Sequence, residues 1–211
     1  MNYTNEIVDV LHIVASRSDQ VRLEAGLSEV ELSRAEEIYG FRFPPDLREV
    51  LAQVLVTNTP EVERPSFPNW REVPNDSVQM RMDWPLEMLL WDVEHNWRLP
   101  GWPKHSRPDE SPQNMTRALK GERQPGEDLQ AMTRATLDAA PRLIPIFSHR
   151  FLPETPCESG NPIFSMHGTD TIIYGADLLS YLCHEFKVSD PRKEEPLLKK
   201  IRFWSALAWD D

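Results

Sequence analysis

Apolar residues recur at helical spacing in two neighbouring segments of the first third of the chain. In the first segment the repeating positions are Leu32, Ala35 and either Ile38 or Tyr39. In the second segment they are Leu47, Val50, Leu51, Val54 and Leu55. Each set falls on one side of a helix with about 3.6 residues per turn. The pattern predicts two short helices within residues 27–55.

Polar and special residues mark where these two helices begin and end. Ser28, followed three residues later by Glu31, has the sequence of a capping box. Gly40 stands where a left-handed residue ends a helix. Pro44 and Pro45 then stop the chain and set the backbone for the first turn of the next helix. The two helices are therefore expected to meet at a stiff elbow.

Helical patterns also occur at residues 5–16, at 83–96 and at 128–140. In the 83–96 helix we expect Asp83 to be the N-cap and apolar side chains to occupy two faces. A helix that is apolar on two faces is usually buried, or has one face left for a partner. The many prolines of residues 57–76 exclude a long element there.

The later part of the chain has the pattern of strands. Residues 143–147 favour an edge strand because they include Pro145. Residues 163–167 and 171–174 favour a hairpin around Gly168-Thr169, and Asp177 is placed to cap a following helix. The apolar residues 201–209 are expected to pack back as a strand or a short helix. Helices first and strands later indicate an α+β fold with a mixed or antiparallel sheet packed by helices.

Two blocks of the sequence resemble the signature of the SUKH superfamily. The first comprises Gly26-Leu27-Ser28, Glu31, Ala35-Glu36, Gly40-Phe41 and Phe43-Pro44-Pro45-Asp46-Leu47-Arg48. The second comprises Gly160-Asn161-Pro162-Ile163-Phe164-Ser165, Asp170, Tyr174-Gly175 and Leu178-Leu179-Ser180-Tyr181-Leu182. The segment Phe67-Pro68-Asn69-Trp70-Arg71 resembles an FPxWR sequence of bacterial members, where Phe67 and Trp70 are suited to pin a loop to the core.

The resemblance implies a sheet with helices packed on one side and a single domain over residues 1–186. A polar excursion at about 98–141 and a charged extension at 187–211 lie beyond the matched blocks. The superfamily contains bacterial toxin-immunity proteins, which bind a toxin directly, and fungal regulators of cell-wall synthesis. The resemblance therefore implies a non-catalytic binding protein. A regulatory scaffold is the alternative, although the long disordered arms of the fungal relatives are missing.

The charge of the chain is acidic and unevenly distributed. Residues 1–100 contain 18 acids against 9 arginines and no lysine, within a total net charge of −11. Such a surface disfavours nucleic acid and suits a basic protein, such as a nuclease-like toxin, or serves solubility alone. The sequence shows no signal-peptide pattern and no membrane-spanning run, which predicts a cytoplasmic protein without membrane contact. The sequence slightly favours a monomer over an oligomer.

Five of the seven tryptophans lie between residues 70 and 102, which indicates either core packing or a partner-binding face. On the second interpretation the predicted anchors are Trp84, Trp91, Trp97 and Trp102. The predicted charged contacts are Asp83, Asp92 and Glu94. The other interpretation of Asp92 and Glu94 is a solvated acidic edge.

The sequence contains no phosphate-binding loop, zinc-protease motif or nucleophile elbow. His149, Cys157 and His167 are the candidates for a small metal site or enzyme, but their spacing matches no known ligand pattern. We therefore predict no cofactor, no metal and no catalysis.

Overall fold

The computed structural model describes residues 3–59, 66–94 and 125–208; of these, Glu94, residues 125–130 and Met132 are described for the backbone only. Its helices are α1 (Tyr3–Ser16), α2 (Glu29–Tyr39), α3 (Pro45–Gln53), α4 (Asp76–Glu94), α6 (Pro125–Asp138), α7 (Leu178–Glu185) and α8 (Trp204–Ala208). Its strands are β1 (Val21–Ala25), β2 (Val54–Asn58), β3 (Leu143–Phe147), β4 (Arg150–Pro153), β5 (Ile163–His167) and β6 (Asp170–Gly175). The predicted α+β fold is confirmed.

Within these residues the strands form two antiparallel sheets. β1 pairs with β2, and β3-β4-β5-β6 form a four-stranded sheet in sequence order. β3 is an outer strand, so Pro145 lies where a missing N–H is tolerated. The predicted hairpin around Gly168-Thr169 is confirmed, because His167 pairs with Asp170.

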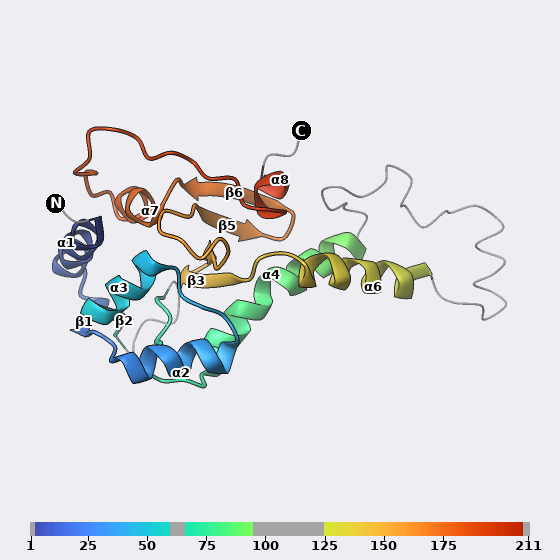
Figure 1. Cartoon of the computed structure of the whole chain (residues 1–211), viewed down its shortest axis with the longest axis horizontal. Coiled ribbons are helices and arrows are strands. Elements are labelled where there is room, and N and C mark those ends of the chain that lie inside the picture. The colour runs from blue at the N-terminus through green and yellow to red at the C-terminus, as the bar shows by residue number, and fades with distance from the viewer. Residues whose placement is uncertain (1–2, 60–65, 95–124, 209–211) are drawn as a thin grey trace.

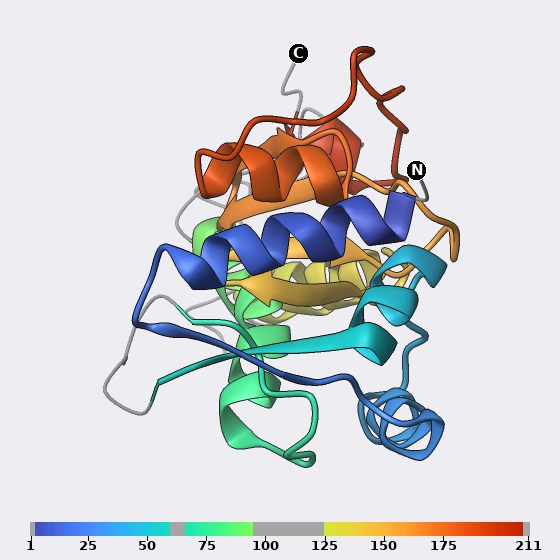
Figure 2. The ribbon, with the colours of Figure 1, turned by 90° about the vertical axis from the view of Figure 1, so that its left-hand side faces the viewer.

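Helices cover both faces of the four-stranded sheet. Figure 2 shows α1 and α7 in front of the sheet, and Figure 1 shows α4 and α6 on its other side. One core cluster takes Ile144 and Leu152 from the sheet, together with residues of α1, α3 and α7. The second takes Phe151 and Phe164, together with residues of α4 and α8. The expectation of helices on one side only is therefore wrong.

The alternation of side chains explains why both faces are buried. Leu143 joins one cluster and Ile144 joins the other, and Phe151 and Leu152 separate in the same way. A strand with two covered faces is apolar at every position, as the wholly buried β3 is.

Both predicted ends of α2 are present. Ser28 and Glu31 form the capping box, and Gly40 ends the helix with a φ of 66°. A positive φ of this size is strained for other residues, which accounts for glycine here. Glu31 also accepts a hydrogen bond from Arg71 Nε at 3.0 Å. This bond ties the start of α2 to the segment that follows β2.

Several elements differ from the prediction. Val54 and Leu55 belong to β2 rather than to α3, because the run Val54–Asn58 pairs with β1. The long helix starts at Asp76 rather than at Asp83, since the side chain of Asn75 accepts the N–H groups of Ser77 and Val78. β4 has no counterpart among the strands predicted from the sequence.

Trp70 and Arg71 hold the loop before α4 to the rest of the fold. The Trp70 ring is buried and lies edge-on to Phe41 and Phe43, at centroid distances of 5.7 and 5.2 Å. Arg71 forms ion pairs with Glu24 at 2.7 Å and with Glu31. The FPxWR-like segment is therefore structural, as expected for Phe67 and Trp70.

The Asp46 carboxylate joins the start of α3 to the loop before β5. Its Oδ2 accepts the N–H of Gly160 at 2.8 Å, and its Oδ1 accepts the N–H of Leu47 at 2.9 Å. The residue is 1% exposed, and burial raises the pKa of its carboxyl although these N–H groups lower it. Asp46 therefore connects the two blocks that carry the family resemblance.

The end of the chain returns to the core, as the sequence predicts. Trp204 and Leu207 of α8 are buried in the second cluster, and Trp204 Nε1 donates to the carbonyl of Pro141 at 2.7 Å. The charged segment before α8 is held by ion pairs, including Arg192 to Asp177 at 2.5 Å. Trp209 lies outside the described residues.

Replacing Asp46 by alanine is expected to lower the free energy of unfolding. The change removes the acceptor of two N–H groups, one buried and one partly buried, at a cost of roughly 1–3 kcal/mol. Part of this cost is offset, because the buried charge no longer has to be desolvated. Urea unfolding measures the difference. The control is Asp19→Ala at an exposed site, which should stay within about 0.5 kcal/mol of the parent. Equal stabilities of the two variants would contradict a role for the buried carboxylate.

The Glu31 carboxyl is expected to titrate far below its ordinary range. Hydrogen bonds from Ser28, then from Arg71, lower its pKa from 4.5 to about 2. A lowered folded-state pKa stabilises the fold above the unfolded value, so this contribution is lost as the pH falls from 4.5 to about 2. Carboxyl NMR gives the pKa directly. Glu31→Gln should unfold with a weaker pH dependence over this interval, and a Glu31 pKa near 4.5 would refute the assignment.

Candidate protein-binding surface

One face of α4 presents large apolar side chains to solvent. Met80 is 59% exposed, Trp84 37% and Trp91 53%. Carboxylates share this face, since their spacing of three, four or seven residues places them beside these side chains. We call this set the α4 stripe: Asp76, Met80, Asp83, Trp84, Glu87 and Trp91.

The opposite face of α4 holds the helix against the core. Val78, Leu89 and Val93 are buried there, as is Pro85. The cap at Asn75 fixes the first turn. Because the buried face fixes the rotation of the helix, Trp84 and Met80 are directed outward.

The α4 stripe combines apolar area with negative charge. It contains three carboxylates and no basic residue. The neighbouring Arg81 is directed elsewhere, because its Nη1 donates to the carbonyl of Ser66 at 2.6 Å. Asp83 accepts both hydrogen bonds from the amide of Gln79 at 3.0 Å. Exposed Trp and Met flanked by carboxylates suit a partner surface that has apolar and basic side chains.

Asp92 is not part of this surface, so its interpretation as a surface charge is wrong. It is 7% exposed, and its Oδ2 accepts the N–H of Thr169 at 2.5 Å and the hydroxyl of Thr169 at 2.9 Å. A Cβ at Gly168, whose φ is 65°, would overlap this carboxylate. Asp92 therefore fastens α4 to the turn between β5 and β6.

The structure places Asp83, Trp84 and Trp91 on one face of α4, and their contact with a partner stays a prediction. Trp97 and Trp102 lie outside the described residues, and Glu94 is described for its backbone alone. The prediction missed further members of the stripe, namely Asp76, Met80 and Glu87. The signal was present as helical spacing. Asp76 and Met80 were missed because the predicted helix begins only at Asp83, whereas Glu87 lies inside the predicted helix and was not singled out.

The three residues of the metal hypothesis do not come together. His149 and His167 stack with their ring centroids 5.5 Å apart, and burial, Arg150 and His167 lower the pKa of His149. Cys157 is elsewhere, with its Sγ 3.8 Å from the carbonyl oxygen of Phe43. In the part of the chain that the structure describes, no group of three His, Cys, Asp or Glu side chains is placed to hold a metal ion.

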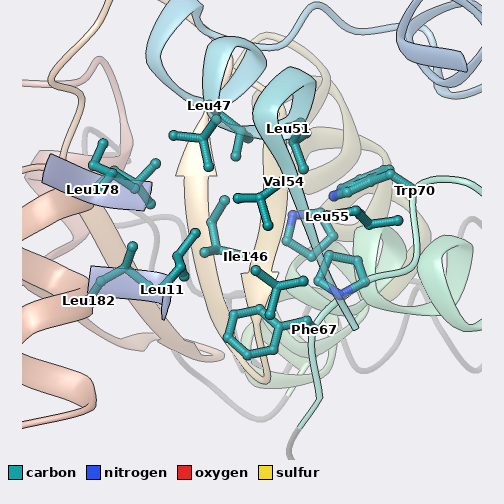
Figure 3. Close-up of a pocket in the computed structure, with 15 residues that line it drawn as sticks. Leu11, Leu47, Leu51, Val54, Leu55, Phe67, Trp70, Ile146, Leu178 and Leu182 are labelled. Carbon is teal, nitrogen blue, oxygen red and sulfur yellow. The ribbon is translucent and has the colours of Figure 1, made fainter. Parts of the chain in front are cut away.

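A small apolar cavity lies between the two sheets (Figure 3). Its volume is about 50 Å³, and its lining includes Val54 and Leu55 of β2, Ile146 of β3, and Trp70. A cavity without polar partners stays dry even when a water molecule would fit. It is a packing gap where the sheets meet, and its almost wholly apolar lining has little to orient a polar ligand.

Comparisons of the chain with protein-family models, with curated proteins and with solved structures return no match. The resemblance to the SUKH superfamily therefore stays a prediction. Among the described residues, no helix is long and apolar enough to cross a membrane.

Replacing each of two aspartates of α4 by alanine is expected to change the free energy of unfolding by different amounts. Asp92→Ala should lower the free energy of unfolding by about 1–3 kcal/mol, because the partly buried N–H and hydroxyl of Thr169 lose their acceptor. Asp83→Ala should stay within about 0.5 kcal/mol of the parent, because its site is partly exposed. Urea unfolding compares the pair, and a larger loss for Asp83→Ala would reverse the two assignments.

Proposed function

We propose that the chain is a non-catalytic protein-binding module of the immunity type. It would neutralise a basic, nuclease-like toxin by direct binding, with the α4 stripe as the contact surface. The toxin would contribute lysine or arginine side chains and an apolar patch. Binding at or beside the active surface of the toxin would block access of its substrate.

The observation that carries the proposal is the exposure of Met80, Trp84 and Trp91 on one helical face that also bears three carboxylates. Large apolar side chains are costly to expose, and contiguous apolar patches on a surface mark interaction sites. Trp is favoured among the residues that dominate binding energy. Acidic side chains around it accelerate the encounter with a basic partner.

The residues that carry the family resemblance support the fold rather than the contact. Asp46 and Glu31 accept backbone N–H groups inside the chain, and Glu31 also pairs with Arg71. Neither residue belongs to the α4 stripe. A common scaffold with a separate exposed surface fits a group of proteins whose partners differ.

Co-purification of the tagged chain from its native host is the first experiment. A single basic protein, toxic when expressed alone and harmless when this chain is co-expressed, would support the proposal. Its release should increase with salt, because salt screens exposed charges. A neutral multi-protein assembly would favour the regulatory alternative instead.

Trp84→Ala is expected to weaken binding of the toxin by roughly 30-fold or more, the effect of losing about 2 kcal/mol at a hot spot. Asp83→Lys should slow association, and more so at low salt. Calorimetry or surface plasmon resonance measures both effects. Leu197→Ala is the control, because it removes a more exposed apolar side chain outside the stripe. Unchanged affinity of Trp84→Ala would exclude the α4 stripe as the contact.

A further inference from the structure

A groove runs beside the α4 stripe on the other flank of Asp83. It is bordered by the end of α2, by α4 and by the segment from α6 into β3. Its volume is about 630 Å³, within the range of roughly 300–1,000 Å³ typical of ligand sites. We call it the α4–α6 groove. Its apolar lining includes Leu86 of α4, Leu137 of α6 and Trp204 of α8.

The wall formed by Trp204 is preformed. The Trp204 ring is almost completely buried, and its Nε1 donates to the carbonyl of Pro141, which also lines the groove. The ring also lies edge-on to Phe203 at a centroid distance of 4.8 Å. A partner would therefore meet an ordered apolar surface, which reduces the entropy lost on binding.

The charges of the groove favour a cation. Asp83 and Asp138 line it, from α4 and α6 respectively. Its basic residue is Arg142, whose Nη1 donates to the carbonyls of Tyr39 at 2.7 Å and Gly40 at 2.9 Å. That guanidinium is engaged with the end of α2, whereas Asp138 is exposed. An apolar floor with carboxylates from two helices complements an apolar side chain next to a basic one.

We propose that the α4–α6 groove receives a segment of the partner protein that carries a large apolar side chain flanked by Lys or Arg. This inference rests on the proposed function and deepens it, because the groove and the α4 stripe share Asp83. The apolar side chain enters between Leu86 and Leu137, and the basic neighbours approach Asp83 and Asp138. Each protein thus contributes one anchor to the interface: this chain contributes Trp84, and the partner contributes an apolar residue.

The larger hollow between α2 and α3, of about 800 Å³, is a weaker candidate. Three of its four acids, Glu29, Glu36 and Glu49, are engaged within the chain. Arg48 pairs with Glu29 at 2.5 Å and with Glu36 at 3.3 Å, and Glu49 accepts a hydrogen bond from Thr4. A basic partner would have to displace these pairs.

The probe is a fluorescein-labelled peptide, Lys-Lys-Phe-Leu-Lys-Lys, measured by fluorescence anisotropy against the full chain. Two control peptides are Lys-Lys-Gly-Ser-Lys-Lys, which has the same charge, and Glu-Glu-Phe-Leu-Glu-Glu, which has the same apolar pair. The first peptide should bind at least about tenfold more tightly than either control, a difference of about 1.4 kcal/mol. Equal binding of the two basic peptides would mean non-specific attraction to the acidic chain and would overturn the inference.

Two variants locate the site. Ala140→Trp fills the groove and should reduce binding of the first peptide by about tenfold or more. Asp138→Lys changes an exposed residue, so it keeps the test valid if Ala140→Trp fails to fold. It should also weaken binding by about tenfold, while Asp19→Lys, which makes the same change of charge away from the groove, should act several-fold less. Equal effects of Asp138→Lys and Asp19→Lys would place the peptide elsewhere.

The two proposals fail separately. If the peptide binds in the groove but no toxin is captured, the docking site stands and the immunity function does not. If a toxin is captured and Trp84→Ala weakens it while Ala140→Trp and Asp138→Lys do not, the immunity function stands and the groove is not its docking site.

Discussion

The buried carboxylate of Asp46 is the contact on which the arrangement of the domain depends. It accepts the N–H of Gly160, more than a hundred residues away, and so joins the helical first part of the chain to the loop that leads into β5. Burial opposes its charge and raises its pKa, and the two N–H donors offset part of this effect. An interior carboxylate that has all its partners specifies one position for α3 against the sheet.

The four-stranded sheet is covered by helices on both faces. On one side, α1, α3 and α7 cover Ile144 and Leu152. On the other, α4 and α8 cover Phe151 and Phe164, and Asp92 secures α4 to the turn after β5. To form the second cluster, α4 must pack one apolar face against the sheet. Its remaining apolar side chains then have no place in the core.

This division explains why α4 is a good candidate for partner binding. The fold uses Leu89, Asp92 and Val93 for stability, whereas Trp84 and Met80 lie outside both clusters. The same helix lines the groove whose other wall is formed by α6 and Trp204. A protein partner that touches α4 therefore meets outward anchors on one flank of Asp83 and an apolar depression on the other.

The sequence by itself determined the local features. Ser28 with Glu31, Gly40 and Asp177 predicted their helix ends correctly, because a cap depends on residues within one turn. It also predicted the hairpin around Gly168-Thr169 and the return of the C-terminal residues. The pairing of β2 with β1 was missed, because helical spacing of Val54 and Leu55 also fits a short buried strand.

The tertiary structure alone decided which side of each element is buried. Whether Asp92 or Asp83 faces solvent depends on where the turn at Thr169 lies, and that turn is 77 residues further along the chain. The same holds for the groove, whose walls come from α2, α4, α6 and α8. A local pattern reports the spacing of apolar residues along one element. Only long-range packing selects the partner of each face, because burial is a property of surfaces that meet in space.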